Sequence, residues 1–383
     1  MNRRDFLKIP AGLALAGLAG PILPNRALAA RSDSLNILCW EGYNTGDVLD
    51  PFRRLHPDAK IRAESSTDDP DMINKLRAGE RNIWDLINVN QPWAREQLYP
   101  ANLIKPLDRN RFEPYFEKMM PYFREKDGTP IKWALDPSGR DLIGMTQRFG
   151  PFSFVVNTKK ISKKMAEDQG YKLFLDPKMK GRYGVLTYDN WNVIHLCLTA
   201  DFDPFRKHTP EELAKFKTVA EQIFSGAKLL SGDLVAMNTA LINGEIDAYF
   251  TGGTYTASPA RYDGRSEVRG ITPNSGPVNG KGGVVWIEVT SLVNNPNPST
   301  LAPQFLEYVQ QPKVAKRVAF AEGTYNPVAQ MGSKDTMALF DKDELDAIQW
   351  DTLEEEMDGS IDFDVNPDYD EMYKIYLDAR RKV

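Results

Sequence analysis

Aromatic and acidic side chains stand together at the ends of short apolar segments that we predict to be β-strands. Trp40 ends the first segment and Tyr43 follows it, while Asp189 follows a later segment. Trp286 and Glu288 share one face of a third segment, because side chains alternate along a strand. Aromatic faces beside carboxylates suit an organic cation, since each cation–π contact contributes about 0.5–2 kcal/mol and ion pairing adds to it. These residues predict a binding site for a small organic cation.

Catalytic and metal chemistry have less support in the sequence. It contains no G-x-S-x-G elbow, no Walker A loop, no G-x-G-x-x-G after the first strand and no H-E-x-x-H motif. The three histidines and two cysteines lack metal-ligand spacing, so we expect no metal or cofactor. Cys39 and Cys197 either form one bridge or remain buried thiols. An exported hydrolase stays open as a minor alternative, because paired carboxylates can come from distant positions.

The elements that would position these side chains alternate between strand and helix. Alternation of this kind is typical of a largely parallel sheet covered by helices. Ligands of open α/β sheets bind outside the carboxyl ends of the strands, which is where the candidate residues fall. A helix that ends in Gly-Glu before a strand occurs twice, which suggests two related lobes. The predicted strands are 35–40, 59–64, 83–89, 183–187, 246–250 and 284–288, and the predicted helices are 47–55, 71–78, 210–224, 234–242 and one or two within 299–320.

The two ends of the chain predict export and an exposed surface. Residues 1–29 combine Arg3-Arg4, an apolar stretch over 9–18 and a small-residue A-L-A end, the parts of a cleavable signal. The paired arginines indicate the twin-arginine route, and hence a periplasmic protein. The acidic stretch 341–371 holds 14 carboxylates against one lysine, and we expect it to be a solvated helical face or loop without chemistry.

Length and charge narrow the class of protein further. Cleavage after residue 29 would remove four basic residues and one acidic residue, which moves the formal charge from −5 to −8. An acidic protein without a basic tract is a poor nucleic-acid binder. The remaining chain, about 354 residues, is long enough for two domains.

Several sequence motifs together resemble a known family. Residues 305–315 read F-L-E-Y-V-Q-Q-P-K-V-A and 323–327 read G-T-Y-N-P; shorter matches are L-N-I-L-C-W-E-G-Y at 35–43, W-D-L-I at 84–87, G-E-I-D at 244–247 and G-G-V-V-W-I-E at 282–288. In these motifs the chain resembles the spermidine/putrescine-binding proteins of ABC transporters, within the extracellular solute-binding proteins. The resemblance covers nearly all of the chain after residue 29.

This resemblance implies a fold and a role. The fold is α/β, a type II periplasmic binding protein with two lobes, each a central mixed sheet flanked by helices, joined by two crossing strands. We expect lobe 1 to comprise 34–136 and 287–325, and lobe 2 to comprise 137–286 and 326–383 with the C-terminal helices. The first crossing strand would be 131–135. The role is that of a monomeric binding protein, not an enzyme, which delivers a polyamine or related amine to an ABC permease at the inner membrane.

The resemblance also implies ligand contacts. The aromatic contacts would enclose the ligand, and the two acids would pair with its ammonium groups. Trp93 lies one position beyond an aromatic residue of the family's cleft. The implied ligand-binding residues are Trp40, Tyr43, Trp93, Asp189, Asn192, Trp286, Glu288 and Tyr325.

Three departures from the family pattern leave the ligand open. Asn192 stands where the family has a second acid, and Gly252-Gly253 stand where it often has tryptophan. Arg140 and Arg148 lie in extra sequence, and an arginine in the cleft could bind a carboxylate bidentately. A non-polyamine metabolite, such as an amino acid-like zwitterion or an organic anion, is therefore the alternative ligand.

Overall fold

The computed structural model describes residues 30–66, 68–320 and 323–382. The predicted export signal, residues 1–29, lies outside the described residues. Within the described part of the chain, no helix has the length and apolar character needed to cross a bilayer.

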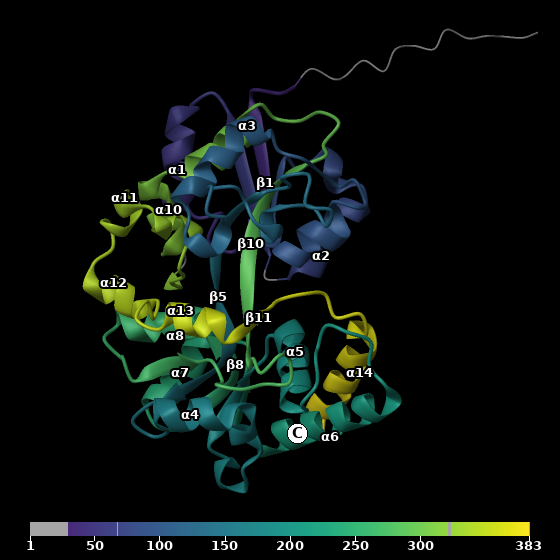
Figure 1. Ribbon diagram of the computed structural model, residues 1–383, viewed down its shortest axis with the longest axis vertical. Helices are drawn as coiled ribbons and strands as arrows, with labels where there is room; N and C mark the ends of the chain where they lie inside the picture. Colours follow the sequence, from purple (N-terminus) through teal and green to yellow (C-terminus); the bar gives the residue numbers. More distant parts are fainter. Residues whose placement is uncertain (1–29, 67, 321–322, 383) are drawn as a thin grey trace, which may run out of the picture.

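The described residues form one mixed sheet of 11 strands flanked by helices (Figure 1). Eight strands follow the order β2-β1-β3-β10-β5-β8-β6-β7; β4 and β11 also pair with β10, and β9 pairs with β5. The strands are β1 Ser34–Trp40, β2 Lys60–Ser66, β3 Leu86–Asn90, β4 Ile104–Lys105, β5 Met145–Asn157, β6 Tyr183–Leu186, β7 Leu229–Ser231, β8 Ala248–Gly253, β9 Val268–Ile271, β10 Gly283–Val293 and β11 Ser360–Asp362.

The α-helices cover both ends of this sheet (Figure 1). Helices α1 and α2 lie beside β1 in one half of the molecule, while α4, α6, α7 and α14 lie in the other. The helices are α1 Gly46–Leu55, α2 Asp69–Arg77, α3 Arg109–Phe112, α4 Lys163–Gln169, α5 Asp189–Thr199, α6 Pro210–Gly226, α7 Leu234–Ile242, α8 Thr254–Tyr262, α9 Leu301–Val309, α10 Pro312–Ala319, α11 Lys334–Met337, α12 Lys342–Ala347, α13 Leu353–Asp358 and α14 Tyr369–Arg380.

Two long strands, β5 and β10, join the two halves (Figure 1). Every residue of both strands is buried. One half of β10 pairs with β3, and its first residues pair with β11 in the other half. Strand β5 pairs with β10 at its start and with β8 and β9 at its end. The predicted α/β fold is confirmed in this arrangement of two sheet regions joined by crossing strands.

The first crossing strand lies later in the chain than predicted. Residues 132–134 form a single 3₁₀ turn, in which the backbone N–H of Leu135 donates to the carbonyl of Lys132 at 3.2 Å. The apolar pair Trp133 and Ala134 is buried, which gives this turn the appearance of a strand in the sequence. The crossing strand is β5 instead, and the prediction of 131–135 was wrong.

Strand β5 contains a proline, Pro151. Proline cannot donate to a ladder and argues against a central strand. Here Pro151 is opposite Val285 of β10, while the pairing of β5 with β8 begins only at Phe152. Pro151 therefore occupies a position where β5 has a strand partner on one side alone.

The helices predicted from periodicity and capping are present. Helix α6 begins with the expected capping box, in which Thr209 accepts from the backbone of Glu212 and Glu212 accepts from that of Thr209. The region 299–320 forms α9 and α10, separated just before Pro312. A proline at the first position of a helix loses no hydrogen bond, because that N–H has no partner within the helix.

The acidic stretch 341–371 is more than a solvated face. It forms α12, α13 and strand β11, whose first two residues are buried. Glu356 is buried, and burial raises its pKa to about 7 despite hydrogen bonds from Thr352 and Gln349. The expectation that this stretch is a solvated face was wrong for these positions.

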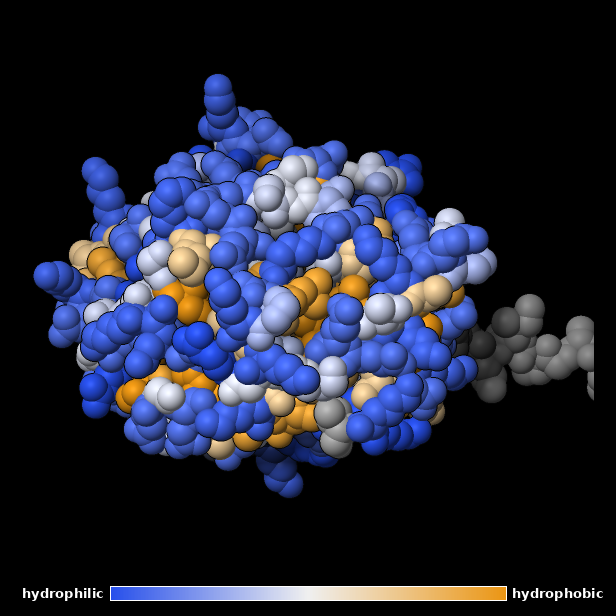
Figure 2. Space-filling view, turned by 90° about the horizontal axis from the view of Figure 1, so that it is seen from below, coloured by the Kyte–Doolittle hydropathy of each residue, from blue (hydrophilic) through white to orange (hydrophobic). Residues whose placement is uncertain are grey.

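Figure 2 shows a mainly hydrophilic face, on which hydrophobic residues form small separated patches. Cys39 and Cys197 are buried in different core clusters and form no disulfide with each other.

Candidate ligand-binding site

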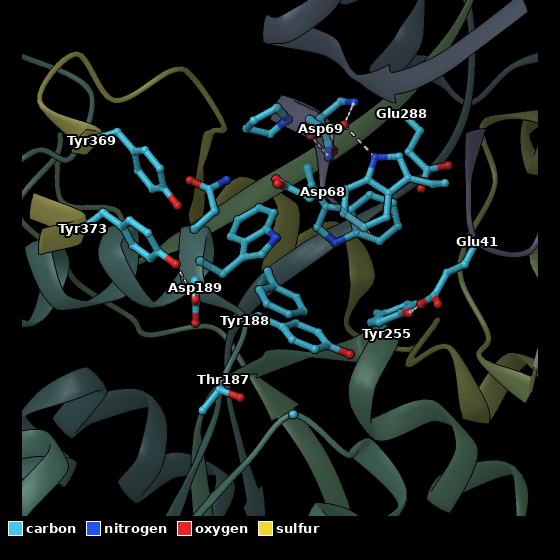
Figure 3. Close-up of a pocket in the computed structure, with 18 of the residues that line it drawn as sticks. Glu41, Asp68, Asp69, Thr187, Tyr188, Asp189, Tyr255, Glu288, Tyr369 and Tyr373 are labelled. Atoms are coloured by element: carbon cyan, nitrogen blue, oxygen red, sulfur yellow. Dashed lines mark hydrogen bonds between the residues drawn. The ribbon is translucent and has the colours of Figure 1, made fainter. Parts of the chain in front are cut away.

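A cavity of about 660 Å³ lies where the two halves of the sheet meet β5 and β10 (Figure 3). Most of its lining comes from the carboxyl ends of strands and from the loops and helix starts that follow them, as expected for an open α/β sheet. The remainder comes from the faces of β5 and β10 and from α14. The lining residues are Trp40, Glu41, Asp68, Asp69, Pro70, Asn90, Arg148, Phe152, Thr187, Tyr188, Asp189, Asn190, Trp191, Gly232, Tyr255, Trp286, Glu288, Tyr369, Asp370 and Tyr373.

The lining is aromatic and acidic. Six carboxylates face the cavity, and Arg148 is the single basic residue among the lining residues. Eight of the lining residues are aromatic. Aromatic faces attract cations through the ring quadrupole, and uncompensated carboxylates repel anions. The lining therefore favours a cationic ligand.

Four of the eight predicted ligand-binding residues line this cavity: Trp40, Asp189, Trp286 and Glu288. Trp286 and Glu288 face it from β10, as strand alternation predicts. Trp286 packs edge-on against Tyr255, with ring centroids 6.4 Å apart. The structure thus brings together residues that lie up to 248 positions apart in the sequence.

Glu288 forms a buried ion pair with Arg148. Nε and Nη2 of Arg148 donate to the two carboxylate oxygens at 3.0 and 2.8 Å, and the side chains are only 2% and 4% exposed. The hydroxyl of Tyr43 donates to the same carboxylate at 2.8 Å. The sequence assigns Glu288 to a ligand ammonium, but here its charge is already matched by a guanidinium.

A β-bulge places Arg148 opposite Glu288. The pairing of β10 with β5 shifts register between Ile287 and Val289, so two residues of β5 oppose Glu288 alone. A bulge of this kind redirects a side chain and is common beside binding sites. Arg148 also lies over the ring of Tyr43 at 4.7 Å, and its Nη2 donates to the carbonyl of Glu41 at 2.8 Å.

These contacts keep both Arg148 and Tyr43 protonated. Burial alone would lower the pKa of Arg148, but the charge of Glu288 raises it above the usual arginine value. Burial, followed by the nearby charge of Glu288, raises the pKa of Tyr43 well above that of a free tyrosine. Tyr43 therefore keeps its proton and acts as a hydrogen-bond donor behind the cavity wall.

Asp69 is a buried acid with an unusual protonation equilibrium. Its carboxylate accepts from Nε1 of Trp40 at 2.7 Å and from the backbone and side chain of Asn90 at 3.1 and 2.8 Å. Burial outweighs these hydrogen bonds and raises its pKa to about 7. Because the folded pKa exceeds the unfolded one, this group's contribution to stability is present below about pH 4 and is lost as the pH rises through about 7.

Asp189 begins α5 and is held by α14. The hydroxyls of Tyr373 and Tyr376 donate to its carboxylate at 3.0 and 2.6 Å, and Arg380 approaches it at 3.3 Å. Tyr369 and Tyr373 stack at 5.5 Å between centroids, and both face the cavity. Helix α14 thereby forms one wall of the site (Figure 3).

The other four predicted residues lie outside the lining. Tyr43 lies behind Glu288, as described above. Trp93 packs against core clusters of both halves, and its indole N–H has no hydrogen-bond partner among the described residues. Tyr325 packs on Tyr262 and Phe320, with centroids 4.6 and 4.8 Å away.

Asn192 supports the backbone beneath the site. Its Nδ2 donates to the carbonyl of Leu186 at 2.9 Å, and its Oδ1 accepts from the hydroxyl of Thr251 at 2.7 Å. Thr251 has φ +68° at a register shift between β5 and β8, a strained conformation for a β-branched residue. Asn192 is fully buried and holds this bulge rather than facing the cavity.

Of the two arginines considered from sequence, only Arg148 lines the cavity. Arg140 is exposed, and its Nε donates to Ser138 at 3.0 Å.

Sequence reasoning overlooked Asp68, Tyr255, Tyr369, Asp370 and Tyr373. Asp68 had a readable signal, because an acid at the turn between a strand and a helix lies at the carboxyl edge of the sheet. The α14 residues had none, since their partner Asp189 is more than 180 positions away. Asp370 also shows that the acidic stretch contributes to the site, contrary to the expectation of a solvated face.

Metal binding has no candidate centre within the described residues, where no group of three or more His, Cys, Asp or Glu side chains could hold an ion.

Two halves of an α/β sheet joined by two crossing strands form the periplasmic binding protein fold, and solved structures share it. The Tp0655 (TpPotD) lipoprotein of Treponema pallidum superposes with a TM-score of 0.66 at 13% identity, covering 92% of this chain and 100% of that one. A Listeria monocytogenes protein provisionally identified as a spermidine/putrescine ABC transporter gives 0.69 at 13%, with 92% and 100% covered. The predicted resemblance to spermidine/putrescine-binding proteins is therefore confirmed for the fold.

The same fold accommodates other ligands. The binding protein AgtB from Agrobacterium tumefaciens, in complex with agropinic acid, gives a TM-score of 0.58 at 15% identity, covering 91% of this chain and 99% of that one. The sequence matches no protein-family model and no curated protein. The class of ligand must therefore be argued from the side chains of this pocket.

Proposed function

We propose that this chain is the substrate-binding protein of an ABC importer, which captures a polyamine or a related small organic amine and delivers it to the permease at the inner membrane. The observation that carries the proposal is the pocket lining: six carboxylates and eight aromatic residues against a single arginine. Such a lining stabilises an ammonium group by ion pairing and by cation–π contact.

The proposal also covers the absence of turnover, the export route, the oligomeric state and the limits of the lobes. The structural neighbours reported above include an ABC transporter protein and the binding protein AgtB, which supports a protein that binds without turnover. We further propose export to the periplasm by the twin-arginine route, a monomeric state, and the lobe limits predicted from sequence.

A second candidate, an amine-bearing metabolite outside the polyamines, is favoured by Arg148. A guanidinium in the lining can donate to a carboxylate or carbonyl of an amino acid-like ligand. An organic anion without an amine is disfavoured by the six carboxylates.

A thermal-shift screen followed by calorimetry tests the proposal. Amines, amino acids, sugars and organic anions should be screened against the exported form of the protein. We expect amines to raise the melting temperature and to bind at one site per chain, because ligand that binds only the folded state stabilises it. Stabilisation by sugars or anions with none by amines would contradict the proposal, and turnover of a ligand would indicate an enzyme.

A further inference from the structure

The two ends of the pocket differ in how their charges are balanced. In Figure 3, Asp189, Tyr369 and Tyr373 lie at one end, and Glu41, Tyr255 and Glu288 lie at the other. These groups therefore face different parts of a bound ligand.

The first end, which we call the acidic end, comprises Asp68, Asp189 and Asp370 with the stacked Tyr369 and Tyr373. Asp68 and Asp189 are close enough for the charge of Asp189 to add to the burial and the charge of Asp71 that raise the pKa of Asp68. The one cation that contacts these three carboxylates within the described residues is Arg380, 3.3 Å from Asp189. The acidic end therefore has more negative charge than the protein itself neutralises.

The second end, which we call the arginine end, comprises Arg148, Glu288, Glu41 and Tyr255. Both oxygens of Glu288 are paired with Arg148, whereas the carboxylate of Glu41 accepts from the neutral hydroxyl of Tyr255 and has no ion pair among the described residues. This end therefore keeps one carboxylate without a cationic partner, against two at the acidic end. Arg148 uses Nε and Nη2 in its hydrogen bonds, while its Nη1 has no partner among the described residues. Arg148 lines the cavity although its side chain is only 2% exposed.

A second ammonium group would be poorly placed beside Arg148. It would approach a guanidinium that is fixed by Glu288, by the carbonyl of Glu41 and by the ring of Tyr43. Like charges brought together in a desolvated site are unfavourable. An uncharged acceptor, in contrast, could accept from Nη1 without placing like charges together.

We propose that the ligand carries one cationic amine, bound at the acidic end, and an uncharged hydrogen-bond acceptor at its other end, bound by Nη1 of Arg148. The proposal rests on the proposed function, which it narrows from amines in general to amines with one cationic end. Arg148 is the residue that selects against a second ammonium group.

A matched series of ligands tests this inference by calorimetry. The series is putrescine, the amino alcohol of the same length in which a hydroxyl replaces one amine, and butylamine, each with its longer homologues. We expect the best amino alcohol to bind at least tenfold more tightly than the diamine and the alkylamine of equal length. A diamine that binds as tightly as the amino alcohol would overturn the inference while leaving the proposed amine function intact. If no ligand of the three series binds, both the inference and the proposed amine function are overturned.

The variant Arg148→Gln tests whether Arg148 sets this preference. Its loss leaves Glu288 without a counter-charge, so the variant should bind the diamine at least as tightly as the amino alcohol. Arg140→Gln is the matched control, because Arg140 is exposed and outside the lining, and it should keep the wild-type order. An unchanged order in Arg148→Gln would contradict the role of Arg148. If that variant fails to fold, the wild-type ligand series decides the matter alone.

Discussion

The substitution Glu288→Gln should destabilise the unliganded protein, because it leaves the guanidinium of Arg148 buried without a counter-charge. The two side chains are 2% and 4% exposed and share two hydrogen bonds. Removing one partner of a buried pair costs about 3–5 kcal/mol. Glutamine keeps one acceptor for Arg148, so we expect the lower limit, about 3 kcal/mol.

This loss of stability corresponds to a decrease in the melting temperature. The entropy of unfolding is about 2.1 cal/mol/K per residue, or about 0.7 kcal/mol/K for a chain of about 350 residues. A loss of about 3 kcal/mol therefore lowers the melting temperature by about 4 °C. Differential scanning calorimetry without ligand is the suitable measurement.

Two further variants separate the charge effect from general damage. Glu221→Gln breaks an exposed ion pair with Lys382 and should leave the melting temperature nearly unchanged, since such pairs contribute little. The double variant Arg148→Met with Glu288→Leu removes both charges and should recover most of the loss. A single variant as stable as the wild type would refute the buried pair, and a double variant no better than Glu288→Gln would refute the unpaired charge as the cause.

Two other predictions concern the acids of the pocket. Asp69→Asn removes the ionisable group, so the free energy of unfolding of the variant relative to the wild type should rise between about pH 4 and pH 8, by up to about 4 kcal/mol. Thermal unfolding across this range checks this prediction. A difference that does not depend on pH would contradict the raised pKa of Asp69. Asp189→Asn should weaken binding of the best amine more than tenfold in calorimetry. Tyr376→Phe, which removes one hydrogen bond to Asp189 but no charge, should weaken it only a few-fold, and equal effects would argue against a direct role for the charge of Asp189.

The fold could be predicted because its determinants are local. Strand and helix alternate with clear apolar periodicity, and a capping box at Thr209 and Glu212 marks the start of α6. Strand β5 was the exception, since Pro151 argues against a central strand and only the pairing partners show why it is tolerated.

The site could be predicted only where strand ends or strand alternation mark it. Trp40 and Asp189 lie at or just after strand ends, Trp286 and Glu288 share one face of β10, and all four line the pocket. The position of Arg148 depends on the register shift between β5 and β10, which no local pattern reveals. The α14 wall likewise depends on contacts across more than 180 residues.

The two features that sequence reasoning left open or overlooked are the ones on which the ligand class depends. Strand ends supply half of the aromatic residues and most of the acids, which fit any small organic cation. The bulge in β5 adds Arg148 and cancels the charge of Glu288, while α14 adds Tyr369, Asp370 and Tyr373 at the opposite end. The charge asymmetry of the pocket therefore arises from long-range pairing, and for that reason a resemblance in local motifs indicates an amine without indicating how many charges it carries.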